Sequence, residues 1–300
     1  MELINKDFQL SEEAIKSYHT KGYVKLAGLF TEECMQYLLE CATAQIVPSE
    51  KHVANRLAGI KYDLENNMLV DLFNHPIFKK IMRVLTKTQL LFTHDIAFKI
   101  EKTKSSGLGW HVGEQSFGYQ RIEDYGCTMW TPLIPIDNSK QKGGMAYIPE
   151  NILSGEFIFK QMRNAVVSSL NKSITQGQPI SSEQLYKFEN ILNTPVIEEI
   201  LGYHIEADDF NLGDAFLFNK MVIHRSIKME DGPMEHRLAY VMRFIDSESK
   251  YDQARVDNIE ATRIHHGNSP DRYFYHKLNL KDGDLIRESD YFENVEERLI

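Results

Sequence analysis

The sequence predicts an α+β protein whose core is a mainly antiparallel β-sheet. Helical patterns dominate residues 10–88. Beyond residue 89 the chain changes to short strand-like runs separated by long excursions. Helices followed by strands are typical of the α+β class, whereas α/β proteins alternate the two. With 300 residues and 42% hydrophobic side chains, the chain can bury one large core. We therefore predict a single domain over 1–300, with a helical part (1–88), a β core (89–247) and a C-terminal extension (248–300).

The helical part begins with a helix-start signal. Ser11 is a good N-cap residue, and the two glutamates that follow it suit the first turn of a helix. This helix is expected to end at about residue 20. Three further elements are expected here: a short strand at 22–26, a second helix from 31 to 39, and a helical stretch at 70–88 with Pro76 near its start.

The β core is expected to contain six strand-like runs and one long insert. The insert, residues 151–200, is helical and polar in character, and an insert of this length beside a site often serves as a lid or a wall for the substrate. The C-terminal extension is polar and irregular. The expected strands are 90–93, 96–100, 127–131, 146–148, 215–218 and 238–245.

Composition limits the partners and the cell compartment. The chain has 43 acidic and 34 basic side chains, a net charge of -9, and no basic run, which argues against nucleic-acid binding. No apolar stretch approaches the length of a membrane span, and the N-terminus lacks a secretory pattern. Three cysteines suggest no disulfide framework. We expect a cytoplasmic protein with no membrane association.

Two of the eleven histidines stand apart by their context. His111 follows the flexible segment 107–110, and His224 ends the apolar stretch 215–223. Arg237 begins the return strand, thirteen residues after His224. An isolated histidine is more often structural than a ligand, so these two are candidates because of their neighbours and not by type.

These segments resemble, in their order and spacing, the phytanoyl-CoA dioxygenase family of iron(II)/2-oxoglutarate enzymes. The similarity covers most of the chain. It implies a double-stranded β-helix (jelly-roll or cupin-like) core with flanking N-terminal helices and a helical insert. It also implies iron(II) and 2-oxoglutarate as cofactors and O2 as co-substrate. The similar segments are 10–39, Gly109–His111, 129–137, 143–149 and 213–218, followed by His224 and Arg237.

The resemblance assigns roles to individual residues. His111 and His224 would bind the iron, and Arg237 would hold the distal carboxylate of 2-oxoglutarate, for which a planar guanidinium is well shaped. Trp130 would pack near that cofactor. Arg243 is six residues beyond Arg237 and so lies on the same strand face. It could face the same cavity or pair with a surface acid.

Gly113 is the departure from the usual pattern. In most such enzymes the residue two after the first histidine is an acid that binds the metal, because side chains at i and i+2 of a strand point the same way. With glycine, one coordination position of the iron is open and the site lacks the negative charge of a carboxylate. A halide ion can occupy that position and supply the charge. A glycine or alanine there resembles the aliphatic halogenases, as does the spacing from His224 through Arg237 to Arg243. The resemblance implies chlorination of an unactivated C–H through an iron(IV)-oxo chloride, with chloride or bromide as the halide.

Two alternatives remain open. A bulge could turn Glu114 onto the iron, or water could complete the site, and the protein would then be a hydroxylase or another 2-oxoglutarate oxidase. Alternatively, the chain could be an iron-free descendant that only binds a ligand. Strand alternation places Glu114 on the face opposite His111, which argues against Glu114 as a ligand of the iron. The expected substrate is a small molecule, either free or tethered to a carrier protein. The acidity of the chain offers no attraction to an acidic carrier.

Overall fold

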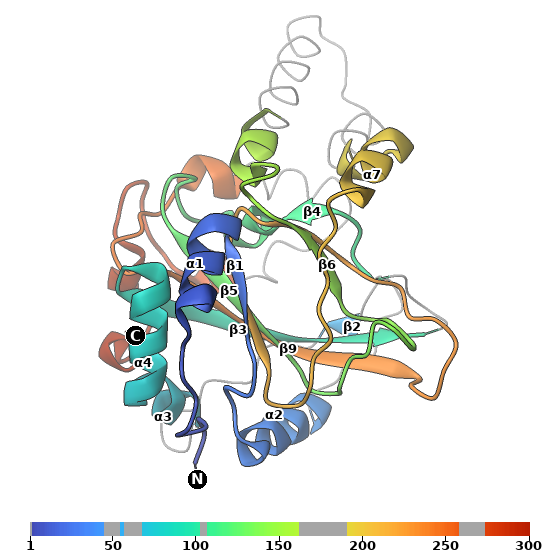
Figure 1. Ribbon diagram of the computed structural model, residues 1–300. Helices are drawn as coiled ribbons and strands as arrows, with labels where there is room; N and C mark the ends of the chain where they lie inside the picture. Colours follow the sequence, from blue (N-terminus) through green and yellow to red (C-terminus); the bar gives the residue numbers. More distant parts are fainter. Residues whose placement is uncertain (1, 45–54, 57–67, 103–106, 162–190, 258–273) are drawn as a thin grey trace, which may run out of the picture.

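The computed structural model describes residues 2–44, 55–56, 68–102, 107–161, 191–257 and 274–300. Two antiparallel sheets face one another, as Figure 1 shows. The larger has the strand order β1-β7-β5-β9-β3-β2, and the smaller has the order β4-β8-β6. This arrangement is the predicted double-stranded β-helix. The strands are β1 (Tyr23–Leu26), β2 (Asn55–Arg56), β3 (Leu90–Glu101), β4 (His111–Val112), β5 (Gly126–Pro132), β6 (Met145–Ile148), β7 (Ala215–Asn219), β8 (Ile223–Ser226) and β9 (His236–Asp246).

Strand alternation separates the side chains into an inner and an outer set. Along β9, Tyr240 and Met242 pack on the outside of the larger sheet, while Ala239 and Val241 pack between the two sheets. Trp130, Phe216, Phe218 and Tyr147 join the inner set. Because the period of a strand is two, the arginines at 237 and 243 belong to the inner face as well. The space between the sheets is therefore apolar with a few charged side chains directed into it.

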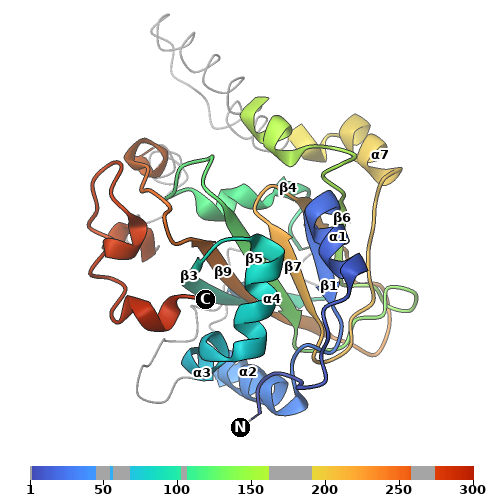
Figure 2. The ribbon, with the colours of Figure 1, turned by 60° about the vertical axis from the view of Figure 1, so that its left-hand side comes forward.

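Four helices cover the outer face of the larger sheet. Figure 2 shows α1 and α4 in front of the sheet and α2 and α3 at its lower end. Their apolar residues form one core cluster with outward-facing residues of β3, β5, β7 and β9. The helices are α1 (Glu12–Lys21), α2 (Glu32–Ala44), α3 (Met68–Asn74) and α4 (Pro76–Thr86).

The helical expectations are confirmed with one correction. The side chain of Ser11 caps α1 by accepting a hydrogen bond from the backbone of Ala14, as its position predicted. The stretch 70–88, expected as one helix, is two helices that meet at His75. The residue before a proline is disfavoured in the helical region, and His75 has extended backbone angles before Pro76. Pro76 therefore starts a new helix rather than lying inside one.

The strand expectations are confirmed in position, with two differences. The runs 90–93 and 96–100 form the single strand β3, with an irregularity between Phe92 and His94. Residues 223–226 form a separate strand, β8, which the apolar run 215–223 had concealed. The polar tail is irregular as expected, in short 3-10 turns (Phe274–Lys277, Ile286–Glu288, Val295–Arg298), but it also buries its own apolar cluster against β3 and β9.

The insert lies on the outer side of the smaller sheet. Its described parts are a helical segment at 155–161, a 3-10 turn at Ile191–Asn193 and helix α7 (Pro195–Gly202), while residues 162–190 lie outside the described part. Leu192 and Leu201 pack against Val112 and Ile223 of the smaller sheet. Among the described residues, no helix is both long and apolar enough to cross a membrane.

Candidate iron and 2-oxoglutarate site

His111 and His224 lie directly opposite one another on β4 and β8. Opposed residues of an antiparallel pair direct their side chains to the same face of the sheet. That face is the inner one, because Val112 and Ile223, the next residues on each strand, pack outside. The imidazole ring centroids are 4.2 Å apart. The fold therefore brings together two histidines that are 113 residues apart in sequence.

Each imidazole is oriented by a carbonyl of its own chain segment. Nδ1 of His111 lies 2.8 Å from the carbonyl oxygen of Gly109, and Nδ1 of His224 lies 3.0 Å from that of Val222. A carbonyl can only accept, so both rings carry hydrogen on Nδ1 when they are neutral, and Nε2 of each keeps a lone pair. Metal-binding histidines are commonly fixed in this way.

Burial keeps both rings neutral. Burial lowers the pKa of His111. The hydrogen bond to Gly109 raises this pKa, and the nearby charge of Arg243 lowers it, so that the net shift is downward. The pKa of His224 is lowered more strongly, by burial first and then by His111 and Arg243. A neutral imidazole is the form that binds a metal, so neither ligand needs to lose a proton near neutral pH.

Gly113 lies beside the imidazole of His224. A Cβ on Gly113 would lie 3.4 Å from Cε1 of His224, and it would also lie 3.0 Å from the carbonyl oxygen of Lys220. The β7–β8 turn thus closes against the glycine. Among the described residues, no third histidine, cysteine, aspartate or glutamate joins the two histidines in a possible metal-binding group.

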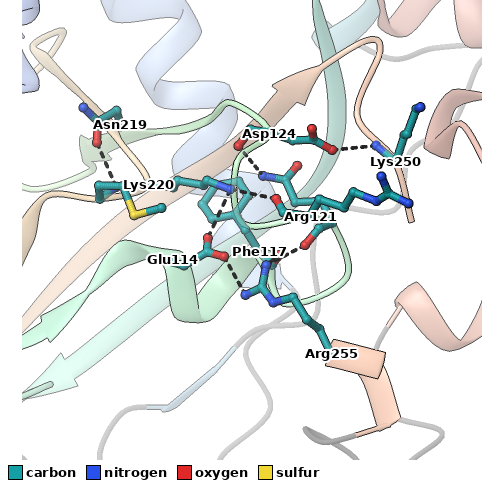
Figure 3. Close-up of polar contacts among 10 residues, drawn as sticks. Glu114, Phe117, Arg121, Asp124, Asn219, Lys220, Lys250 and Arg255 are labelled. Carbon is teal, nitrogen blue, oxygen red and sulfur yellow. Dashed lines mark hydrogen bonds and ion pairs between the residues drawn. The ribbon is translucent and has the colours of Figure 1, made fainter. Parts of the chain in front are cut away.

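Glu114 points away from the histidines into a buried ion-pair cluster. Figure 3 shows its carboxylate between Lys220 and Arg255. Oε1 lies 2.5 Å from Nη2 of Arg255, and Oε2 lies 3.5 Å from Nζ of Lys220. All three side chains are buried, and Glu114 has no exposed surface. Burial raises the pKa of Glu114, and both cations oppose that rise. A carboxylate paired in this way is not available to the two histidines.

The two cations also tie the backbone around Glu114 together. Nζ of Lys220 donates to the carbonyl of Arg121 at 3.2 Å. Nη1 of Arg255 donates to the carbonyls of Phe117 and Gln120. Figure 3 labels Arg121 and Phe117 beside these two cations. The turn after Gly113 is therefore connected both to the β7–β8 turn and to the C-terminal extension. A lysine inside the apolar run 215–223 was a signal for the first connection, whereas nothing in the sequence marked Arg255.

Arg237 is a buried cation beside Trp130. Only 4% of Arg237 is exposed, and burial lowers its pKa to about 10. Nη1 donates to the carbonyls of Gly143 and Gly144 at 2.8 and 3.1 Å, while the buried Nε has no hydrogen-bond partner among the described residues. Its guanidinium lies 5.7 Å from the centroid of the Trp130 ring. A buried guanidinium held by neutral carbonyls and an indole still requires an anion.

Arg243 faces the same interior, near the histidines. Its charge contributes to the lowered pKa of both His111 and His224, as described above. Its Nη1 lies 3.4 Å from Nε2 of His94, its cross-strand neighbour on β3. Of the two readings that the sequence left open for Arg243, the geometry favours the interior one.

Comparison with known proteins identifies the fold. No protein-family model matches the chain, and no curated protein matches it in sequence. Solved structures do match. They include the non-heme α-ketoglutarate-dependent carbocyclase SnoK from nogalamycin biosynthesis, at 14% identity, a TM-score of 0.60 and 97% coverage of each chain. The epimerase SnoN, in complex with Fe3+, α-ketoglutarate and nogalamycin RO, matches at 16% identity, a TM-score of 0.56 and 93% coverage of each chain.

A third match is EctD from S. alaskensis with bound Fe, at 14% identity, a TM-score of 0.54 and 84% coverage of each chain. The chain shares the fold of these solved structures, which include non-heme α-ketoglutarate-dependent enzymes. At these identities the similarity establishes the fold alone. SnoK and SnoN are a carbocyclase and an epimerase, so they do not support chlorination. The phytanoyl-CoA dioxygenase family and its halogenase-like branch therefore remain predictions.

Proposed function

We propose that this protein is an iron(II)- and 2-oxoglutarate-dependent oxidative enzyme, and that it halogenates an aliphatic carbon of a small molecule. The observation that carries the proposal is the pair His111 and His224, neutral and directly opposed, beside a glycine at the third ligand position. The site residues suit ferrous iron, 2-oxoglutarate and a halide, which this activity requires.

The two histidines suit ferrous iron. Both rings keep an Nε2 lone pair, and both are held by backbone carbonyls. Imidazole is a good ligand for iron, and buried neutral imidazoles need no deprotonation. When bound, iron and 2-oxoglutarate together with O2 supply the oxidant that removes a hydrogen atom from the substrate.

Arg237 suits the distal carboxylate of 2-oxoglutarate. It is a nearly fully buried cation with a hydrogen-bond donor that no described residue accepts. A planar guanidinium binds a carboxylate through two hydrogen bonds and so fixes its orientation as well as its position. Trp130 forms one wall of that position and keeps water from the guanidinium.

Gly113 suits a halide. It has no side chain to bind the metal, and Glu114, the nearest acid in sequence, is held by Arg255 and Lys220. The charge of Arg243 near both histidines favours an anion in this region. The overall reaction is balanced: an aliphatic R–H, 2-oxoglutarate, O2, chloride and one proton give R–Cl, succinate, CO2 and water.

The first test needs no substrate. The protein is loaded anaerobically with iron(II) and 2-oxoglutarate, and the charge-transfer absorption of the complex is followed while chloride or bromide is added, with sulfate as the ionic-strength control. We expect a saturable shift with either halide and none with sulfate. Iron and 2-oxoglutarate binding without a halide response would leave a hydroxylase with water at the third position. Absence of iron binding would leave only the non-enzymatic alternative.

The second test identifies the product. The loaded enzyme is given O2, chloride and small-molecule substrates, free or tethered to a carrier protein, and the products are analysed by mass spectrometry. The isotope pattern of chlorine supports the proposal. Products that carry only added oxygen at every chloride concentration would contradict it.

A further inference from the structure

Asn193 holds the backbone immediately before the first histidine. Its Oδ1 accepts a hydrogen bond from the N–H of Trp110 at 2.6 Å, and its Nδ2 donates to the carbonyl of Trp110 at 2.9 Å. One side-chain amide thus makes both of the hydrogen bonds that a residue of a neighbouring strand would make. A Cβ on Gly109 would lie 2.5 Å from Oδ1 of Asn193, so the glycine permits this close approach.

This contact matters because β4 is short and lies at an edge. It has two residues, and among the described strands it pairs with β8 alone. The other edge would offer unpaired backbone groups just before the iron-binding position. The amide of Asn193 occupies that edge at Trp110. Trp110 lies between His111 and Gly109, whose carbonyl orients the His111 imidazole. The direction of Nε2 in His111 therefore depends on the same backbone that Asn193 holds.

Asn193 is itself held by packing at the end of the insert. It ends the 3-10 turn Ile191–Asn193 and comes just before helix α7. Leu192, which precedes Asn193, and Leu201, in the helix that follows it, are both buried against the outer face of the smaller sheet. Glu198 of α7 adds a second connection, because it pairs with an arginine of β8 at 3.7 Å.

That arginine reaches the same tryptophan from the other side. The guanidinium of Arg225 lies 4.7 Å from the centroid of the Trp110 ring. Trp110 is thus held at its backbone by Asn193 and at its ring by Arg225, and both contacts lead back to the segment 191–202. No similar support from the insert is needed by His224, because β8 lies in the middle of its sheet.

We propose that Asn193 is a positioning residue: it sets the orientation of His111 and couples the end of the insert to the iron site. This inference rests on the proposed iron-binding function. It assigns no chemical step to Asn193. It predicts that metal affinity depends on a residue that lies outside the ligand set and in a segment expected to cover the substrate.

The test measures metal binding and not turnover. Cobalt(II) is titrated into the protein and followed by its visible d–d absorption. Asn193→Leu keeps the number of side-chain heavy atoms and removes both hydrogen bonds, and we expect it to weaken cobalt affinity roughly 10- to 100-fold and to alter the d–d spectrum. Asn138→Leu is the matched control. It removes an amide that donates to the carbonyl of Asp208, a contact that involves neither β4 nor β8. We expect it to leave cobalt affinity within about twofold of wild type.

Asn193→Asp provides a second variant if the leucine variant does not fold. It retains the acceptor for the Trp110 N–H and loses the donor to the Trp110 carbonyl, and we expect a weakening of cobalt affinity between those of wild type and Asn193→Leu. Wild-type affinity and spectrum in a folded Asn193 variant would overturn this inference and leave the proposed function intact. Failure of the wild-type protein to bind cobalt would instead overturn the proposed function, and this inference with it.

Discussion

Replacing Gly113 with aspartate is the sharpest perturbation of the proposed halide position. A Cβ at 113 would lie 3.4 Å from Cε1 of His224, so the carboxylate, one bond further on, would reach the region in which we place the halide. A negative charge about 4 Å from a halide costs roughly 4 kcal/mol at an effective dielectric constant of about 20. This corresponds to chloride binding that is about a thousandfold weaker. We therefore expect Gly113→Asp to abolish the chloride-dependent absorption change at any practical chloride concentration.

Gly113→Ala is the matched control, since it adds the Cβ without the charge. The Cβ would lie 3.0 Å from the carbonyl oxygen of Lys220, so the β7–β8 turn has to shift by a few tenths of an ångström in both variants. Overpacking of this kind costs about 1–3 kcal/mol of unfolding free energy, measurable by urea denaturation. We expect the two variants to lose similar stability, and only the alanine variant to keep the chloride response. An aspartate variant that binds iron and responds to chloride like wild type would refute the assignment of the halide position.

Three further predictions concern the buried charges. Arg237→Leu should weaken the binding of 2-oxoglutarate by about 2–5 kcal/mol of binding free energy, and Arg237→Lys should weaken it less. Unchanged affinity in anaerobic titrations of the iron complex would exclude Arg237 as the carboxylate partner. Arg255→Met should lower the free energy of unfolding by about 3–5 kcal/mol, because it leaves Glu114 buried beside one cation; the double variant with Glu114→Gln should recover part of that loss, and no recovery would mean that the pair is not coupled. Burial lowers the pKa of Lys220 from its usual 10.5 to about 8, so between these pH values the unfolded chain holds a proton that the folded chain has lost. The stability of wild type relative to Lys220→Met should therefore rise as the pH increases from about 8 to 10.5, and a flat difference in urea denaturation would contradict the assignment.

The elements of the fold could be predicted because each depends on local patterns. Ser11 marks the start of α1, Pro76 marks the start of α4, and the apolar runs mark the strands of the larger sheet. The division of 70–88 into two helices was missed because a proline is compatible both with the first turn of a helix and with a kink. The strand β8 was missed because the turn at 220–222 lies within an otherwise apolar run.

The site could be predicted only in part, because its geometry depends on register. The residue types around His111 and His224 indicated a shared function, but only the β4–β8 pairing places them directly opposite one another. Alternation placed Glu114 on the face away from His111, but the strand ends at Val112 and Glu114 lies in the 3-10 turn Gly113–Phe117. Its direction is set by Arg255 and Lys220, which hold its carboxylate. Arg255 and Asn193 could not have been found, because each acts through contacts made by distant parts of the chain.

The two neutral histidines have a consequence for how the proposed iron site would be loaded. Within the described ranges, the site offers a metal two neutral imidazoles and no carboxylate, so a ferrous ion there would keep its full double charge. The dianion of 2-oxoglutarate, and then the halide, would supply the missing negative charge. Iron and 2-oxoglutarate should therefore bind cooperatively, and by thermodynamic linkage each raises the affinity of the other by the same factor. In a cell with little free iron, the level of 2-oxoglutarate would then help to determine how much of this protein carries metal at all.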